Sequence, residues 1–417
     1  MAYTETTSVS WLDRLGSSFR GILIGVVLLI AGNTLLWWNE GNFVGTGDAL
    51  REAHSVTQEL GDIHKLDNSK NGMLVHAVGP VATKDMLSDP VFGVSRNAIR
   101  LERMVEFYQW LEESTSEKRK KLGGSEETVT TYRYAAKWTS RPVDSSQFKD
   151  PGARTEHRNI VLAAMENFKT QAVNVTFGAY RLPAFLIHDI GDAASLDVAL
   201  SEAMKTRLNR QLALAVQSAD PAMSAAREEA SLVHVSGNTV LLSASPGMPR
   251  IGDVRITFKE TRPGTVSILA KLNGDTFEQY HAGNGKTVGI LSMGTHSLEN
   301  MYADAQAANA VMTWILRVVG ALLVIFGIRL IAAPLEVLAG VIPLLGSVIG
   351  AGTGIVSIVL GLAVSFCVIS IAWLRFRPLV GGVMLGVAGV LVALLYVKGR
   401  PRKAANAQAP AAEAKSA

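Results

Sequence analysis

The chain has 417 residues, of which 48% are hydrophobic and 18% are charged, and its formal net charge is +4. This composition is too apolar for a typical soluble protein and not apolar enough for a transporter built only of spans. The small charge excess gathers beside apolar runs, which indicates membrane topology rather than binding to nucleic acid. The single cysteine, Cys367, excludes a disulfide framework or a cysteine-ligated metal site within one chain.

Two regions are long and apolar enough to cross a membrane, residues 21–38 and residues 311–397. A helix needs roughly 20 mostly uncharged residues to cross about 30 Å of hydrocarbon. The first run ends in two tryptophans and lacks a small-residue cleavage pattern, so we interpret it as an uncleaved signal anchor. Basic residues flank the first and last runs, and the positive-inside bias then predicts that both termini are cytoplasmic.

The segment from residue 335 to residue 374 allows either one span with a re-entrant portion or two spans. Four spans leave fewer basic residues on the outer side than five, so we predict an α-helical membrane domain of four spans beside an α+β extramembrane domain. In chain order the predicted segments are a cytoplasmic tail that is either a short interfacial helix or unstructured (1–20), span 1 (21–38), an extracytoplasmic (periplasmic or luminal) α+β domain (39–310), span 2 (311–332), a cytoplasmic loop or re-entrant segment (333–349), span 3 (350–374), span 4 (379–397) and a disordered cytoplasmic tail (398–417).

The α+β domain mixes helical and alternating apolar patterns. Its first half contains a helix (48–60), a strand that ends at Gly79-Pro80 (73–78), a segment whose class stays open (97–113) and a strand paired with the stretch before Gly123-Gly124 (128–138). Its clearest helical pattern covers residues 192–218, with Asp192 as a candidate N-cap and leucines at four-residue spacing.

Strands and turns follow that pattern. Strands at 232–235 and 240–242 flank the turn Gly237-Asn238, and strands at 254–259 and 266–272 flank the turn Pro263-Gly264. From Leu298 a helical pattern continues without a break into the second span.

Tryptophans and glycines in the apolar regions are the candidate functional residues. Tryptophans are expected as membrane-interface anchors, because an amphipathic indole suits that depth: Trp37, Trp38, Trp314 and Trp373. Glycines spaced by four let helix backbones approach closely, either in packing within the chain or in self-association: Gly21, Gly25, Gly346, Gly350, Gly354, Gly382 and Gly386. Few ionisable residues lie inside the spans, which counts against a pump or coupled transporter.

Known catalytic and metal-binding patterns are absent from the sequence. The segment from Gly283 to Thr287 resembles the end of a phosphate-binding loop, but a required glycine is replaced by Tyr280, and a hairpin turn is the better interpretation. No two of the eight histidines are three or four residues apart, so no helix-borne metal pair is predicted. We therefore predict no catalytic residue, no cofactor and no metal.

Several short motifs, in order and with similar spacing, resemble the transmembrane protein 43 family, also called LUMA. They include Asn39-Glu40-Gly41, Ser88-Asp89-Pro90, Glu106-Phe107-Tyr108-Gln109-Trp110, Gly252-Asp253, Thr313-Trp314 with Arg317, and Arg377-Pro378-Leu379. The resemblance implies four spans, cytoplasmic ends and a large luminal domain. It also implies self-association and, for eukaryotic members, organisation of membrane protein complexes with emerin and lamins.

The leading hypothesis from the sequence is a non-enzymatic membrane scaffold that forms a homo-oligomer and presents its extramembrane domain to lipids or to other membrane proteins. One alternative is an oligomeric pore or channel gated by dewetting. A second alternative is an extracytoplasmic ligand-binding or hydrolytic domain. The expected location is the inner membrane in a bacterium, and the endoplasmic reticulum or inner nuclear membrane in a eukaryote.

Overall fold

The structure is a computed structural model that describes residues 3–219, 231–243, 247–339, 341, 343–383, 386 and 389–390. The chain divides into two units. The α+β unit comprises Met1–Trp11 and Gly45–Asn309, and the helical unit comprises Leu12–Val44 and Ala310–Ala417. Each unit is described separately below.

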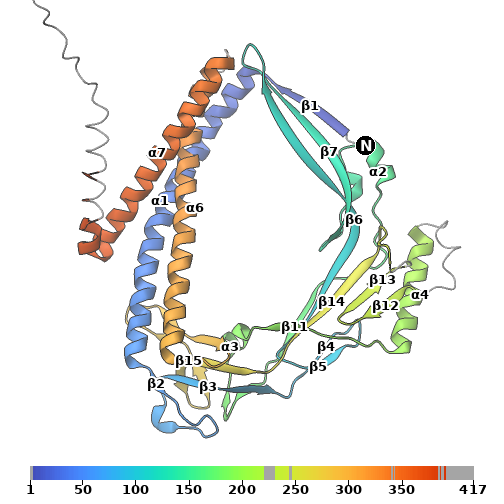
Figure 1. Cartoon of the computed structure of the whole chain (residues 1–417), viewed down its shortest axis with the longest axis vertical. Coiled ribbons are helices and arrows are strands. Elements are labelled where there is room, and N and C mark those ends of the chain that lie inside the picture. The colour runs from blue at the N-terminus through green and yellow to red at the C-terminus, as the bar shows by residue number, and fades with distance from the viewer. Residues whose placement is uncertain are drawn as a thin grey trace, which may run out of the picture. The chain divides into compact units, whose positions relative to one another are not determined.

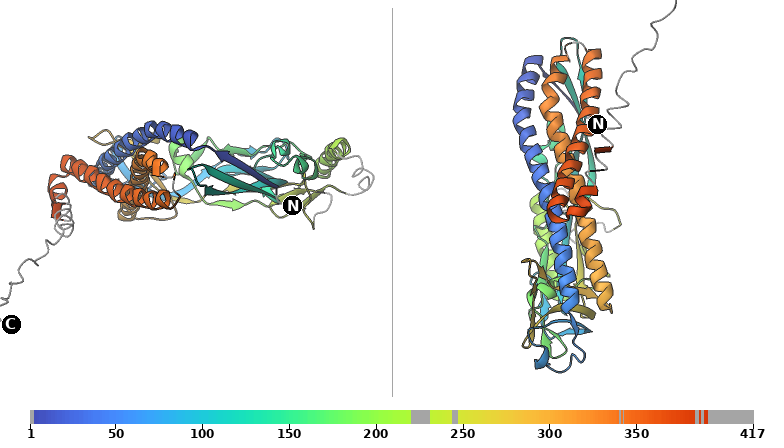
Figure 2. Two further views of the ribbon diagram at one scale, coloured as in Figure 1. Left: turned by 90° about the horizontal axis from the view of Figure 1, so that it is seen from above. Right: turned by 90° about the vertical axis from the view of Figure 1, so that its left-hand side faces the viewer.

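Three long helices supply the helical unit: α1 (Trp11–Val56), α6 (Leu298–Ala339) and α7 (Pro343–Phe376). They lie side by side in two views (Figure 1, Figure 2). Among the described residues, three helices are long and apolar enough to cross a membrane, and these are the same three. Apolar side chains are exposed along them because lipid, rather than water, is the solvent that a span meets.

The boundaries within the helical unit differ from the predicted ones. The expected loop or re-entrant segment at 333–349 is mostly helix, since α6 continues to Ala339 and α7 already begins at Pro343. The predicted fourth span at 379–397 lies largely outside the described residues, although residues 378–383 are again helical. The predicted tail at 398–417 lies entirely outside them.

Glycines allow α1 and α6 to pack as an antiparallel pair. A Cβ atom at Gly25 would lie 2.7 Å from the carbonyl oxygen of Gly327, and one at Gly32 would lie 2.9 Å from that of Gly320. The two contact points are seven residues apart on both helices, so both lie on the same face of each helix. Only glycine permits backbones to approach this closely.

The α+β unit is built around two sheets. The larger has eight strands in the order β1-β7-β6-β14-β13-β12, with β11 on β14 and β8 on β6. The bounds of its strands are β1 (Tyr3–Val9), β6 (Arg100–Lys120), β7 (Glu126–Thr139), β8 (Phe168–Gln171), β11 (Ala193–Ser195), β12 (Val233–Ser236), β13 (Thr239–Leu242) and β14 (Val254–Thr261). Helix α4 (Glu202–Ala219) lies beside β12 (Figure 1).

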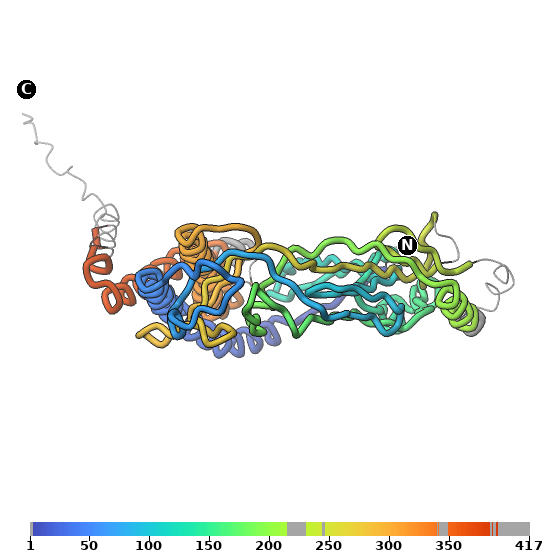
Figure 3. Tube along the Cα trace, turned by 90° about the horizontal axis from the view of Figure 1, so that it is seen from below, coloured from blue at the N-terminus to red at the C-terminus, as the bar shows by residue number. Residues whose placement is uncertain are grey.

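The second sheet has seven strands in the order β19-β15-β16-β10-β9-β3-β2, with β15 also paired to β3. Its strands are β2 (Gln58–Glu59), β3 (Leu74–Thr83), β9 (Val175–Phe177), β10 (Tyr180–Arg181), β15 (Thr265–Asn273), β16 (Thr276–Glu278) and β19 (Ile290–Met293). The Cα trace shows how strands from distant parts of the sequence lie side by side in this unit (Figure 3). Smaller elements are the pairs β4 (Met86–Ser88) with β5 (Ser95–Asn97) and β17 (Tyr280–His281) with β18 (Thr287–Val288), the helices α2 (Pro151–Glu156) and α3 (Ala184–Asp189), and the 3-10 turns η1 (Asn68–Lys70) and η2 (Ser145–Gln147).

Both sheets contribute to one hydrophobic core. Val105, Phe107 and Phe258 come from the larger sheet, and Val75 and Ile268 come from the second; all are buried. This shared burial provides the main stabilisation of the α+β unit, since apolar area removed from water contributes about 25 cal/mol per Å².

The ends of two long helices belong to the α+β unit and pack on its second sheet. Leu50 and Ala53 near the end of α1 form a separate apolar cluster with Leu269 of β15 and with Met301 and Tyr302 near the start of α6. The predicted continuous helix from Leu298 into the second span is confirmed by α6. The predicted helix at 48–60 is the last part of α1, which ends at Val56.

Residues 3–9 differ most from the sequence-based expectation. They form strand β1, antiparallel to β7, with Tyr3 opposite Tyr132 and Val9 opposite Glu126. The sequence analysis predicted no strand here and expected residues 1–20 to form a cytoplasmic tail that is either a short interfacial helix or unstructured. Charge counting does not report such a pairing, because it considers only residues that flank a span. Residues 11–20 are helical, as the first part of α1, which begins at Trp11.

The helix predicted over 192–218 is only half correct. It begins at Glu202, and Asp192 has a φ of 60° rather than an N-cap conformation. The preceding segment is extended along the larger sheet, where the amide of Leu196 donates to the carbonyl of Phe258. Leucines at four-residue spacing fit a buried extended segment as well as a helix, which explains the error.

The turns predicted from the sequence are only partly confirmed. The hairpin at Gly237-Asn238 and the β6–β7 hairpin at Gly123-Gly124 are confirmed. The strands around Pro263-Gly264 exist, but β14 and β15 belong to different sheets, so the turn passes the chain from one sheet to the other. Strand β3 continues through Gly79-Pro80 to Thr83.

Candidate functional site

The helical unit contains a polar cluster of three residues around a buried carboxylate: Glu40, Arg317 and Trp373, one from each long helix. The Arg317 guanidinium donates from Nε to Glu40 Oε1 and from Nη2 to Glu40 Oε2, both at 2.7 Å. The Trp373 indole Nε1 donates to Glu40 Oε2 at 2.6 Å. Glu40 is fully buried, and the guanidinium carbon of Arg317 lies 4.7 Å from the centre of the Trp314 ring. We call these three residues the Glu40 cluster.

This cluster joins all three helices at one point. Bidentate pairing and an indole donor occupy both carboxylate oxygens, which is what a buried carboxylate requires. Beside it, the Asn39 side-chain amide donates to the carbonyl oxygen of Thr313 at 3.1 Å. The arrangement positions helices and offers no nucleophile.

In the sequence, Glu40 and Arg317 stand out only as members of separate motifs, and their contact was not predicted. The sequence does contain one indication of this contact. One acidic residue lies two positions after Trp38, and one basic residue lies three positions after Trp314, so opposite charges occur near the same expected interface.

The four predicted interface tryptophans have different surroundings. Trp37, Trp38 and Trp314 are exposed, as an anchor in headgroups would be, and the ring centres of Trp37 and Phe376 are 6.2 Å apart. Trp373 instead bonds to Glu40.

The predicted glycines differ in how closely neighbouring helices approach them. Gly25 packs against Gly327, and a Cβ at Gly350 would lie 2.7 Å from a carboxylate oxygen of Glu336 in α6. Gly21 and Gly354 have looser neighbours, at 3.9 Å from Leu330 and 3.8 Å from Arg329. At Gly382 and Gly386, a Cβ atom would have no other atom of the described residues within 4 Å. Gly346 lies in α7. Sequence reasoning missed Gly32, Gly320, Gly327 and Gly361, which also pack between helices.

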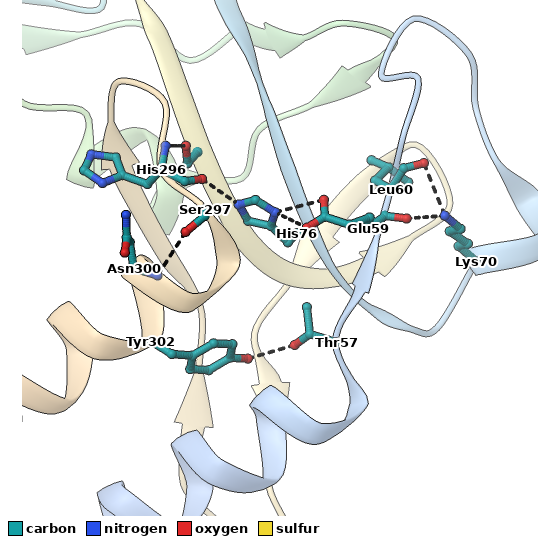
Figure 4. Close-up of polar contacts among 10 residues, drawn as sticks. Thr57, Glu59, Leu60, Lys70, His76, His296, Ser297, Asn300 and Tyr302 are labelled. Atoms are coloured by element: carbon teal, nitrogen blue, oxygen red, sulfur yellow. Dashed lines mark hydrogen bonds and ion pairs between the residues drawn. The ribbon is translucent and has the colours of Figure 1, made fainter.

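In the α+β unit, a second polar cluster surrounds the buried side chain of His76 (Figure 4). Its Nδ1 atom lies 2.8 Å from Glu59 Oε1, and its Nε2 atom lies 3.1 Å from the carbonyl oxygen of His296. Each ring nitrogen therefore faces an oxygen atom. The His76 cluster (Glu59, His76 and His296) links β2, β3 and the loop before α6.

A further polar contact lies next to it at the helix ends. The hydroxyl groups of Thr57 and Tyr302 are 2.8 Å apart (Figure 4). Burial raises the pKa of Tyr302 to about 12. Nearby, the Tyr280 hydroxyl donates to Glu52, and this hydrogen bond together with burial raises the pKa of Tyr280.

The described residues contain no group of three or more His, Cys, Asp or Glu side chains that could hold a metal ion. The segment from Gly283 to Thr287 is the hairpin turn between β17 and β18, as expected. Its amide at Gly283 donates to the Glu52 carboxylate, so this backbone faces an acid rather than a phosphate.

Comparison with known proteins agrees with the resemblance seen in the sequence. Transmembrane protein 43 of Rattus norvegicus is 28% identical over 386 residues, which cover 90% of this chain and 89% of the relative. The Homo sapiens protein of that name is 26% identical over 401 residues, covering 94% and 92%. The Drosophila melanogaster homolog is 28% identical over 386 residues, covering 89% and 93%. No solved structure matches. Because the family model for transmembrane protein 43 matches residues 107–378, well over half of the sequence, this chain belongs to the transmembrane protein 43 family.

Proposed function

We propose that this protein is a non-enzymatic membrane scaffold that self-associates through its helices and presents the α+β unit to other membrane proteins or to lipids. Relatives that match along most of the chain are named as transmembrane proteins and not as enzymes. The proposed location is the inner membrane in a bacterium, and the endoplasmic reticulum or inner nuclear membrane in a eukaryote, with the α+β unit in the periplasm or lumen.

The observation that carries the self-association proposal is the open backbone at Gly382 and Gly386. Gly25, Gly32 and Gly350 are already covered by neighbouring helices of the same chain. Gly382 and Gly386 have no such neighbour among the described residues. Close approach of a second copy at this surface would gain the van der Waals contact that drives helix association in lipid.

The experiment measures the mass of detergent-purified protein by light scattering. The wild-type chain is expected to be an oligomer, and a Gly382→Leu/Gly386→Leu variant is expected to shift towards monomer. Gly16→Leu is the matched control, because a Cβ at Gly16 also meets no atom within 4 Å but lies before the first apolar run. A wild-type chain that stays monomeric at all concentrations contradicts the proposal. Conductance across a bilayer containing the oligomer would favour the pore alternative.

A further inference from the structure

A pocket of about 260 Å³ lies between α6 and α7 within the helical unit. Its lining includes Trp314, Arg317 and Ala321 from α6 and Leu362, Ser365 and Phe366 from α7. Pockets that enclose a drug-sized ligand measure about 300–1,000 Å³, so this one has room for only part of a long molecule.

The lining is apolar apart from two residues, and one of these is already satisfied. The hydroxyl of Ser365 donates to the carbonyl oxygen of Gly361 at 2.8 Å. Arg317 is the only charged residue of the described lining. Its Nε and Nη2 atoms donate to Glu40, while Nη1 has no acceptor among the residues that the structure describes.

The ion pair is asymmetric in its exposure. The Glu40 side chain is 0% exposed, whereas the Arg317 side chain is 16% exposed. The positive partner therefore borders the pocket, and the negative partner is hidden behind it. An occupant with an oxygen acceptor at one end would complete the donor set of the guanidinium.

The surroundings of the pocket indicate the apolar part of the molecule that binds there. The pocket lies within the apolar parts of α6 and α7, both long and apolar enough to span a membrane, so hydrocarbon chains are the molecules at highest concentration there. We propose that this pocket binds one acyl chain of an anionic lipid, whose phosphate or carboxylate oxygen accepts a hydrogen bond from Nη1 of Arg317. A phospholipid and a free fatty acid share this chemistry.

The apolar run at 379–397 is the main rival occupant. It follows α7 directly and lies largely outside the described residues. It contains no acidic side chain, so none of its side chains can pair with Arg317 as an anionic headgroup does. This difference favours the lipid.

The test uses the full chain in phosphatidylcholine nanodiscs with three photoreactive probes, an anionic phospholipid, a fatty acid and a zwitterionic phosphatidylcholine, each carrying the reactive group on its acyl chain. Crosslinked peptides are mapped by mass spectrometry. Label is expected on the pocket-facing parts of α6 and α7. Ala321→Trp, which fills the pocket, should remove it, whereas Val356→Trp on the exposed face of α7 should not.

A second variant keeps the proposal testable if Ala321→Trp fails to fold. Glu40→Gln/Arg317→Gln removes both charges and leaves no unpaired ion. It should reduce the preference for anionic over zwitterionic probe by about tenfold or more, the loss expected for one charge-assisted hydrogen bond.

The competing outcomes identify the occupant. Label from one anionic probe but not the other assigns the site to that lipid class, and label from both anionic probes assigns the shared chemistry. Three results would overturn the proposal: label unchanged by Ala321→Trp, no preference for anionic probes, or an efficient crosslink from a cysteine at Leu362 to residues 379–397.

Discussion

The Glu40 carboxylate and the Arg317 guanidinium are joined by two hydrogen bonds of 2.7 Å, although the residues are 277 positions apart in the chain. The pair connects α1 to α6, and Trp373 adds α7. In an apolar unit, a paired charge holds helices in one register, because any sliding would leave an ion without its partner.

The first prediction concerns this pair. Arg317→Met leaves a buried carboxylate unpaired and should lower the free energy of unfolding by about 3–5 kcal/mol. The double variant Glu40→Met/Arg317→Met removes both charges and should recover most of that loss, since replacing a buried ion pair by apolar residues is often neutral or stabilising. Denaturation in detergent measures both.

The exposed pair of Arg51 and Asp48 is the control for this experiment. Arg51→Ala should change the free energy of unfolding by less than about 1 kcal/mol, because solvent screens exposed ion pairs. An equal loss for Arg317→Met and Arg51→Ala would show that the Glu40 cluster is not buried as described.

The second prediction concerns helix packing. Gly25→Ala places a Cβ atom 2.7 Å from the Gly327 carbonyl oxygen and should destabilise the helical unit by about 1–3 kcal/mol. Gly16→Ala meets no atom within 4 Å and should be neutral or stabilising by up to about 1 kcal/mol, because alanine favours helix. Thermal melting in detergent compares the two, and a matching decrease for both would refute the close contact.

The third prediction is a loss of stability at alkaline pH. The pKa of Tyr302 is raised to about 12 by burial, from an ordinary value of 10.0. The unfolded chain therefore releases this proton first. The stabilisation is fully present below about pH 10 and is lost as pH rises to about 12.

Variants separate the tyrosines that contribute to this loss. The pKa of Tyr134 is also raised to about 12, mainly by burial and then by its hydrogen bond to Glu112. Tyr302→Phe and Tyr134→Phe should each flatten the decrease between pH 10 and 12, and the double variant should flatten it further. Unfolding titrations at a series of pH values provide the measurement, and an unchanged slope in the double variant would disprove the assignment.

The fourth prediction tests strand β1. Thr6 is opposite Val129 in the register of β1 and β7, so cysteines at these positions should form a disulfide under mild oxidation. Cys367→Ser removes the native thiol from the background. Cysteines at Ser8 and Thr131 lie four residues out of register and should not crosslink.

An impermeant thiol reagent adds the compartment to that test. Single cysteines at Thr6 and at Val129 are expected to react from the same side of sealed vesicles if β1 pairs with β7 in the membrane-bound protein. Reaction from opposite sides would restore the tail predicted from charge alone.

Much of the molecule was predictable from local patterns. The sequence by itself determined that the chain enters a membrane, that a helix continues from Leu298 into the second span, and that hairpins form at Gly237-Asn238 and Gly123-Gly124. Hydropathy over a window of helix length and turn chemistry over a few residues carry this information. It also identified the family, since the ordered motifs agree with the match to transmembrane protein 43.

Only the tertiary structure decided which distant segments meet. It placed residues 3–9 on β7, separated β14 from β15 into different sheets, and brought Glu40 to Arg317. Each of these depends on contacts between residues far apart in sequence, and no local period reports them. The extended segment before α4 is a further example. Its conformation at Leu196 depends on the hydrogen bond to the carbonyl of Phe258 in β14 and not on the leucine spacing.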